Sequence, residues 1–233
     1  MVECLAGEAG VPVVKMKNFR DRWVGSTESN LEKIFRLLDA LGRCIVFVDE
    51  ADQALGRRNS DSGDAGVSGR VYGMMAERMS DSRKRGRVLW VLATSRPDLV
   101  EVDLKRPGRV DVKIPLFPTS TPEEGYKLIR ALAKRRGVVL DEELPERFRS
   151  GIPDLLTPGA AEALSVKLYR TLKTGATSPV EALASALRDY QAPVPLSIIQ
   201  AQITLASDEA TDLSFVPERF RSGPGWPGRI RRA

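Results

Sequence analysis

Two adjacent carboxylates, Asp49 and Glu50, are the side chains of this sequence best suited to chemistry. They follow an unbroken apolar run, Cys44–Val48, which is typical of a strand buried on both faces of a parallel sheet. Ligands of such sheets bind outside the carboxyl ends of the strands. Asp49 would then hold Mg²⁺, directly or through water, and Glu50 would polarise a water molecule for attack on phosphorus. The alternative is that the pair only ends a strand at the solvent surface.

The composition narrows the choice of chemistry. The chain has 233 residues and no histidine, which excludes Ser-His-Asp triads and HExxH zinc sites. The net charge of +5 permits contact with phosphates or an acidic partner without requiring it. The two cysteines, Cys4 and Cys44, lack metal-ligand spacing and are interpreted as reduced thiols. With no apolar run that could span a membrane and no signal peptide, we expect a cytoplasmic protein.

The elements that must position the acid pair form an α/β first half. Thr27 is the expected N-cap of the second helix. The strand Val88–Ala93 is expected to be buried on both faces, like Cys44–Val48, and Asp111–Leu116 is a shorter strand at the side of the sheet. The other expected elements of this half are a strand at Val11–Met16 and helices at Met1–Ala9, Glu28–Leu41 and Gly69–Met79.

The second half is predicted to be helical after a hinge at Phe117–Thr121. Thr121 and Thr157 each precede a proline, which is the pattern of an N-cap followed by proline at the first helical position. The expected helices are Pro122–Arg136, Pro158–Lys173, Pro179–Tyr190 and Leu196–Ala206.

Four segments resemble successive motifs of the AAA family of ATPases in order and spacing. They are Trp23–Phe35, Cys44–Asp52, Ala93–Asp98 and Leu104–Asp111. The resemblance covers residues 1 to about 190 and is strongest up to Pro118. It implies a P-loop NTPase-like, doubly wound parallel sheet in residues 1–117, a helical lid in residues 118–208, and a flexible basic tail in residues 209–233.

The resemblance also implies roles for five residues. Asp49 and Glu50 match the Walker B pair, which binds Mg²⁺ and orients the lytic water beside ATP. Ser95 occupies the sensor-1 position, where the family usually has the longer asparagine. Arg106 and Arg109 match the two arginine fingers, which neutralise charge on the γ-phosphate bound to a neighbouring subunit. The alternative for these arginines is a turn with two solvated side chains.

Further implications concern partners. Trp23, Val24 and Gly25 match the first pore loop, with which a hexameric ring of such subunits grips a polypeptide client. The alternative is that Trp23 packs on its own core. Asn59–Gly69 is either the second pore loop or a surface loop.

One family motif is missing, because the sequence contains no GxxxxGK[ST] and no Gly-Lys dipeptide. The family's first strand, which lies in the middle of its sheet, is also missing. We therefore expect a chain that is cut short by a late start codon, a split gene or fragmentation, with genuine loss as the alternative. Without the loop's N–H groups and lysine, the chain alone should bind ATP poorly.

The lid region departs from the family as well. Its usual Gly-Ala-Asp signature is replaced by Gly159–Glu162, and no sensor-2 arginine is found there. Two other functions stay open. One is a non-hydrolysing adaptor that supplies arginine fingers to a partner ATPase. The other is a nucleic-acid motor, which the Trp-Val-Gly loop and the scattered basic charge argue against.

A seven-residue segment occurs twice. Pro145–Gly151 recurs as Pro217–Gly223, which is too short to define a repeat architecture. Each copy is expected to dock its phenylalanine in a groove and keep its arginines outside. The sequence assigns no function to either copy.

Overall fold

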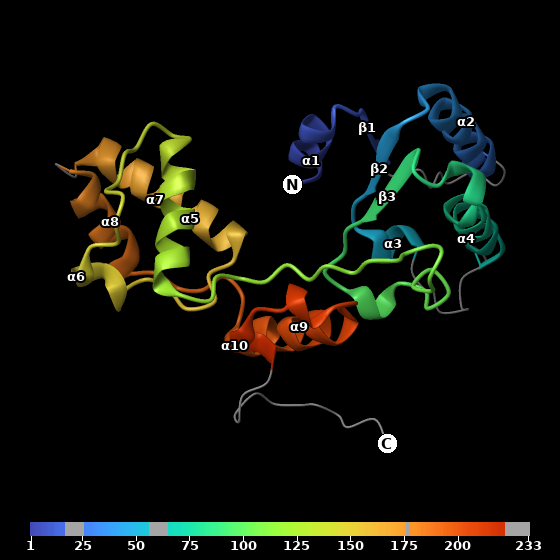
Figure 1. Cartoon of the computed structure of the whole chain (residues 1–233). Helices are drawn as coiled ribbons and strands as arrows, with labels where there is room; N and C mark the ends of the chain where they lie inside the picture. Colours follow the sequence, from blue (N-terminus) through green and yellow to red (C-terminus); the bar gives the residue numbers. More distant parts are fainter. Residues whose placement is uncertain (17–25, 56–64, 176–177, 222–233) are drawn as a thin grey trace, which may run out of the picture. The chain divides into compact units, whose positions relative to one another are not determined.

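The computed structural model of the chain describes residues 1–16, 26–55, 65–175 and 178–221, in two compact units. The first unit extends from Met1 to Lys113, and the second begins at Ile114. Figure 1 shows that the first unit combines a sheet with helices and that the second is helical. The expected α/β class is therefore confirmed, with helices following the sheet.

The first unit is built on a parallel sheet with the strand order β1-β2-β3. Its strands are β1 Val13–Met16, β2 Cys44–Val48 and β3 Val88–Leu92. Val46 of β2 lies between Val14 and Trp90 in the register. Cys44, Val46 and Val48 on one face and Ile45 on the other are at most 2% exposed, and Phe47 is partly buried. The strand that precedes the acid pair is therefore central and largely buried.

Helices lie on both sides of this sheet (Figure 1). Their bounds are α1 Val2–Ala9, α2 Ser26–Leu41, α3 Ala51–Leu55 and α4 Ala65–Ser80, with short 3₁₀ turns η1 Ser82–Lys84 and η2 Pro97–Leu99. Leu31 and Leu38 of α2 and Met75 of α4 pack against Val46 in one core. Figure 1 shows α1 on the opposite side of the sheet. α2 begins at Ser26, so Thr27 lies inside its first turn and not at the expected N-cap.

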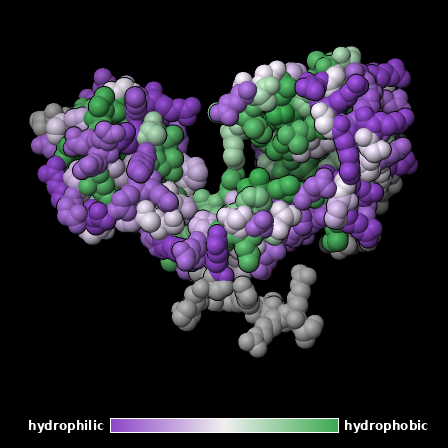
Figure 2. Space-filling model, viewed as in Figure 1, coloured by the Kyte–Doolittle hydropathy of each residue, from purple (hydrophilic) through white to green (hydrophobic). Residues whose placement is uncertain are grey.

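Two expectations about the sheet are wrong. β3 is not buried on both faces, because Leu89 is 52% exposed beside a hollow of about 210 Å³ that Leu5 and Ile45 also line. Figure 2 shows hydrophobic surface over this sheet. Asp111–Leu116 forms no strand, since no described strand lies beside it to supply hydrogen bonds.

The second unit contains a helical bundle whose bounds agree closely with the sequence. Its helices are α5 Pro122–Lys134, α6 Glu146–Arg149, α7 Pro158–Thr174 and α8 Pro179–Arg188. The expected caps are confirmed, because Thr121 Oγ1 accepts from the Glu124 N–H at 3.2 Å and Thr157 Oγ1 accepts from the Ala160 N–H at 3.3 Å. Tyr126, Leu164 and Leu183 are fully buried in the bundle core.

A smaller core lies beside the bundle and involves α9 Leu196–Glu209, the turn η3 Leu213–Phe215 and α10 Glu218–Arg221. Phe220 stacks on Phe117, with ring centroids 5.0 Å apart. Arg219 forms an ion pair with Asp154 at 2.7 Å. Part of the expected flexible tail from residue 209 is therefore folded, while residues 222–233 lie outside the described part.

The repeated segment folds in the same way at both sites. α6 and α10 are four-residue helices with the sequence Glu-Arg-Phe-Arg. Phe148 is 8% exposed in the bundle core, and Phe220 is 7% exposed in the smaller core. The expectation that each copy buries its phenylalanine is confirmed.

Two further observations concern the whole described chain. Cys4 is exposed and Cys44 is buried, and neither forms a disulfide. Within the described ranges, every helix is too short or too polar to cross a membrane.

Candidate functional site

The acid pair lies at the carboxyl end of β2, where α3 begins. The Glu50 N–H donates to Asp49 Oδ1 at 3.0 Å, and Glu50 adopts a left-handed backbone with φ of 48°. The Glu50 carbonyl accepts from the N–H groups of Gln53 and Ala54 in α3. Both carboxylates are exposed. Backbone conformations of this kind in a residue other than glycine are uncommon and cluster at functional sites.

The carboxyl end of β3 is tied to this turn by hydrogen bonds. The Ala51 N–H donates to the Ala93 carbonyl, and the Ala93 N–H donates to the Val48 carbonyl, both at 2.9 Å. Thr94 Oγ1 donates to Asp52 Oδ1 at 2.5 Å and accepts from the Arg96 N–H at 2.9 Å. These bonds hold the loop that carries Ser95 beside the acid pair.

Ser95 itself is exposed, as a side chain that contacts a ligand must be. Its neighbour Arg96 forms a two-pronged pair with Asp98, Nε to Oδ1 at 2.9 Å and Nη2 to Oδ2 at 2.7 Å. The guanidinium lowers the pKa of Asp98. Arg96 is therefore engaged within its own loop, while Ser95 faces solvent.

The two candidate finger arginines have different surroundings. The Arg106 side chain is 73% exposed and lies 3.2 Å from Asp103 Oδ1. The Arg109 side chain is 24% exposed, pairs with Asp103 Oδ2, and donates to the Asp103 carbonyl at 3.1 Å. Tyr72 Oη donates to the same Asp103 Oδ2 at 3.0 Å. Arg106 is accessible to a neighbouring molecule, and Arg109 is largely used within its own unit.

The sequence did not reveal the partners of these residues. No sequence pattern points to Asp52, Thr94, Tyr72 or Asp103, although Asp52 and Thr94 stand inside the matched motifs. Asp103 lies 31 positions from Tyr72, so no local spacing could indicate the contact. Trp23, Val24 and Gly25 lie outside the described residues, as does most of the expected second pore loop.

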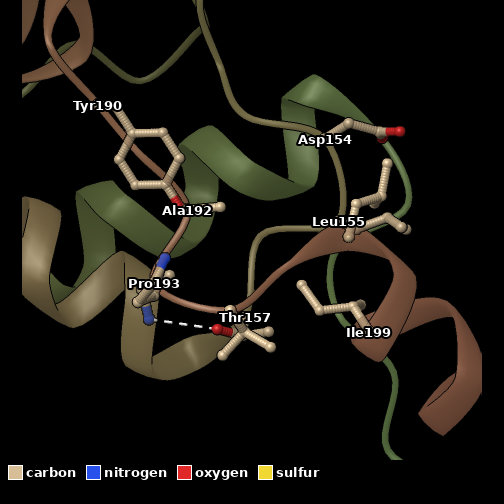
Figure 3. Close-up of a pocket in the computed structure, with 10 residues that line it drawn as sticks. Asp154, Leu155, Thr157, Tyr190, Ala192, Pro193 and Ile199 are labelled. Carbon is tan, nitrogen blue, oxygen red and sulfur yellow. Dashed lines mark hydrogen bonds between the residues drawn. The ribbon is translucent and has the colours of Figure 1, made fainter.

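Two hollows are unsuited to the expected nucleotide. The hollow beside Leu89 lies at the amino ends of β2 and β3, away from the acid pair. The hollow between α9 and the loop before α7 has a volume of about 40 Å³. Figure 3 shows Leu155, Tyr190 and Ile199 around it, with Thr157 bonded to the first turn of α7. That space holds no more than a few water molecules.

The site fits Mg-ATP in part. Asp49, Glu50 and Ser95 offer oxygen atoms at the edge of the sheet, and hard cations such as Mg²⁺ prefer oxygen ligands. The described residues contain no group of three or more acidic or thiol side chains arranged for a metal. The phosphates would need further donors, since residues 1–233 contain no GxxxxGK[ST] motif.

The comparison with known families identifies the class of protein. Residues 1–117 match the family described as "ATPase family associated with various cellular activities (AAA)". Because the match covers half of the chain, this protein belongs to the AAA family, and its parallel sheet is that of a P-loop NTPase-like fold.

Individual relatives include three ATPases. The chain is 30% identical over 131 residues to "Peroxisomal ATPase PEX6" of Dictyostelium discoideum, covering 56% of this chain and 11% of the relative. It is 28% identical over 138 residues to "Peroxisomal ATPase PEX1" of Saccharomyces cerevisiae, covering 58% and 13%. It is 31% identical over 147 residues to the human "ATPase family gene 2 protein homolog A", covering 61% and 16%. The chain thus spans a small part of each relative's length.

Proposed function

We propose that this chain forms the Walker B and arginine-finger part of an ATPase that couples Mg-ATP hydrolysis to remodelling or threading of a protein through a hexameric ring. The observation that carries the proposal is the exposed Asp49-Glu50 turn at the end of the buried central strand, tied to the loop of Ser95. The family match and the ATPase relatives support it.

The residues would divide the work as follows. Asp49 would hold Mg²⁺, which when bound neutralises phosphate charge. Glu50 would accept a proton from the attacking water, and Ser95 would donate a hydrogen bond to that water or to the γ-phosphate. Arg106 would reach the triphosphate on the adjoining subunit. The polypeptide would be gripped by Trp23 of the first pore loop.

A second candidate function rests on Arg106. Its side chain is 73% exposed and could complete a partner's site without hydrolysis by its own subunit. The chain would then act as a non-hydrolysing adaptor or pseudo-ATPase subunit in the same ring.

The test uses an extended chain that carries, ahead of Met1, a strand and a GxxxxGK[ST] loop from an AAA ATPase. We expect Mg-ATP hydrolysis that Glu50→Gln lowers about 100-fold or more and that Arg106→Ala lowers about 1,000-fold. Glu77→Gln, an exposed acid near the end of α4, is the matched control.

Mixing the two inactive variants distinguishes the mechanisms. If Arg106 acts on a neighbour, a Glu50→Gln subunit supplies its arginine to the intact acid pair of an Arg106→Ala subunit, and activity returns. Tight Mg-ATP binding without hydrolysis would favour the adaptor. Hydrolysis that is insensitive to both substitutions would refute the proposed site.

A further inference from the structure

A single carboxylate joins the two finger arginines to the core of the first unit. Asp103 Oδ2 accepts from Tyr72 Oη and pairs with Arg109, while Oδ1 lies 3.2 Å from Arg106. The carbonyl of Asp103 accepts from Arg109 Nη1 at 3.1 Å and from the Arg106 N–H at 3.4 Å. The next residue, Leu104, is fully buried. The carboxylate and the backbone of Asp103 are therefore both held in place.

The protonation states of Asp103 and Tyr72 fit the hydrogen bond between them. Hydrogen bonds from Arg109 and then Tyr72 lower the pKa of Asp103, so the group is a carboxylate at neutral pH. Burial, followed by the bond to Asp103, raises the pKa of Tyr72 to about 12, so its hydroxyl keeps the proton that it donates. At neutral pH, Tyr72 therefore stays a hydrogen-bond donor and Asp103 stays a charged acceptor.

The arginines share this acceptor unequally. Arg109 makes two contacts with Asp103 and is mostly buried, whereas Arg106 makes one exposed contact. Exposed ion pairs are weak because water screens them, so Arg106 can exchange Asp103 for a phosphate. The turn between the arginines contains Gly108 with φ of 92°, and its N–H donates to Asp111 Oδ1 at 2.6 Å.

We propose that Asp103 is a positioning residue: it locks Arg109 and Tyr72 together, so that the turn presents Arg106 alone to the neighbouring subunit's triphosphate. This inference rests on the proposed function. It changes the expected roles of the two arginines, since Arg109 then acts by holding the turn and only Arg106 touches the nucleotide. Tyr72 stands on α4, which contains Gly69, the last residue of the expected second pore loop. The cluster therefore links the finger to that helix.

The first arm of the test uses the unmodified 233-residue chain and ¹⁵N NMR of the arginine side chains. Exchange of the Arg109 guanidinium protons should be slow, and Asp103→Asn should accelerate it about tenfold or more. Tyr72→Phe should have a smaller effect. Asp81→Asn removes a carboxylate that binds the Nε and Nη2 groups of another arginine, Arg83, and should leave Arg109 unchanged. Unchanged exchange of Arg109 in Asp103→Asn would overturn the inference.

The second arm measures hydrolysis by the extended chain. Asp103→Asn should lower kcat about tenfold or more with KM unchanged, and Asp103→Glu should recover part of the loss. Circular dichroism would confirm that each variant is folded. Equal or faster hydrolysis by Asp103→Asn, where Arg106→Ala abolishes it, would overturn the inference and leave the proposed function intact. If Arg106→Ala has no effect, the proposed function fails, and the inference that Arg106 is the presented finger fails with it even where the NMR shows Arg109 held by Asp103.

Discussion

The twin segments allow one sequence motif to be tested in two surroundings. Phe220 is 7% exposed and belongs to a core of five buried side chains among the described residues. Replacement of a buried phenylalanine by alanine costs about 3–5 kcal/mol, of which the stack on Phe117 at 5.0 Å accounts for about 0.5–1.5 kcal/mol. So small a core has little stability to lose, so Phe220→Ala should unfold α9 and α10 while the bundle stays folded.

Phe148→Ala is the matched control. Phe148 is 8% exposed in a core of fifteen buried side chains within the described ranges, so the same loss of about 3–5 kcal/mol should lower the stability of the bundle as a whole.

Hydrogen exchange with mass spectrometry separates the two outcomes. Phe220→Ala should accelerate exchange in peptides from Leu196–Arg221 and leave Pro158–Thr174 protected. Phe148→Ala should instead accelerate exchange in the bundle helices and also speed global unfolding. If Phe220→Ala deprotects α7 as strongly as α9, or if it leaves α9 unchanged, the division of the second unit into two cores is refuted.

Three further predictions concern packing, a hydrogen bond and pH. Gly125→Ala should lower the free energy of unfolding by about 1–2 kcal/mol in urea titrations, because its Cβ would lie 2.7 Å from Ile152 Cγ2. Gly159→Ala is the control and should be neutral or stabilising, because its Cβ would meet no atom within 4 Å. Thr94→Val should cost about 1–2 kcal/mol because it removes the bonds to Asp52 and the Arg96 N–H; a loss that is not reduced in an Asp52→Ala background, which lacks the acceptor, would contradict this. Tyr72 favours folding while its phenol is neutral, so this contribution should be present below pH 10 and lost as the pH rises through about 12; unfolding midpoints of wild type and Tyr72→Phe should converge over that range, and parallel curves would count against it.

Local patterns were sufficient to predict much of the fold. The apolar run Cys44–Val48 predicted the central strand because burial on both faces leaves an uninterrupted pattern. Thr121 and Thr157 predicted two helix starts because a cap acts within three residues. The position of the acid pair at the end of the strand follows from the same pattern, and its role stays a prediction.

Features that depend on distant neighbours were not predictable in the same way. Asp111–Leu116 has the composition of a strand, but a strand requires a partner that local sequence cannot supply. The exposure of Leu89 was unpredictable for the same reason, because the sequence of its strand does not show which face of the sheet is covered by other elements. The unequal burial of Arg106 and Arg109 depends on Asp103 and on Tyr72, which is remote in the chain.

The two cysteines give the first unit a reporter of its own. Cys4 is exposed, whereas Cys44 is 2% exposed at the start of the central strand, and burial raises the pKa of its thiol. A thiol reagent should therefore modify Cys4 at once and Cys44 only when the sheet opens. The slow phase of such labelling would time the opening of the strand that carries Asp49 and Glu50, without any engineered probe.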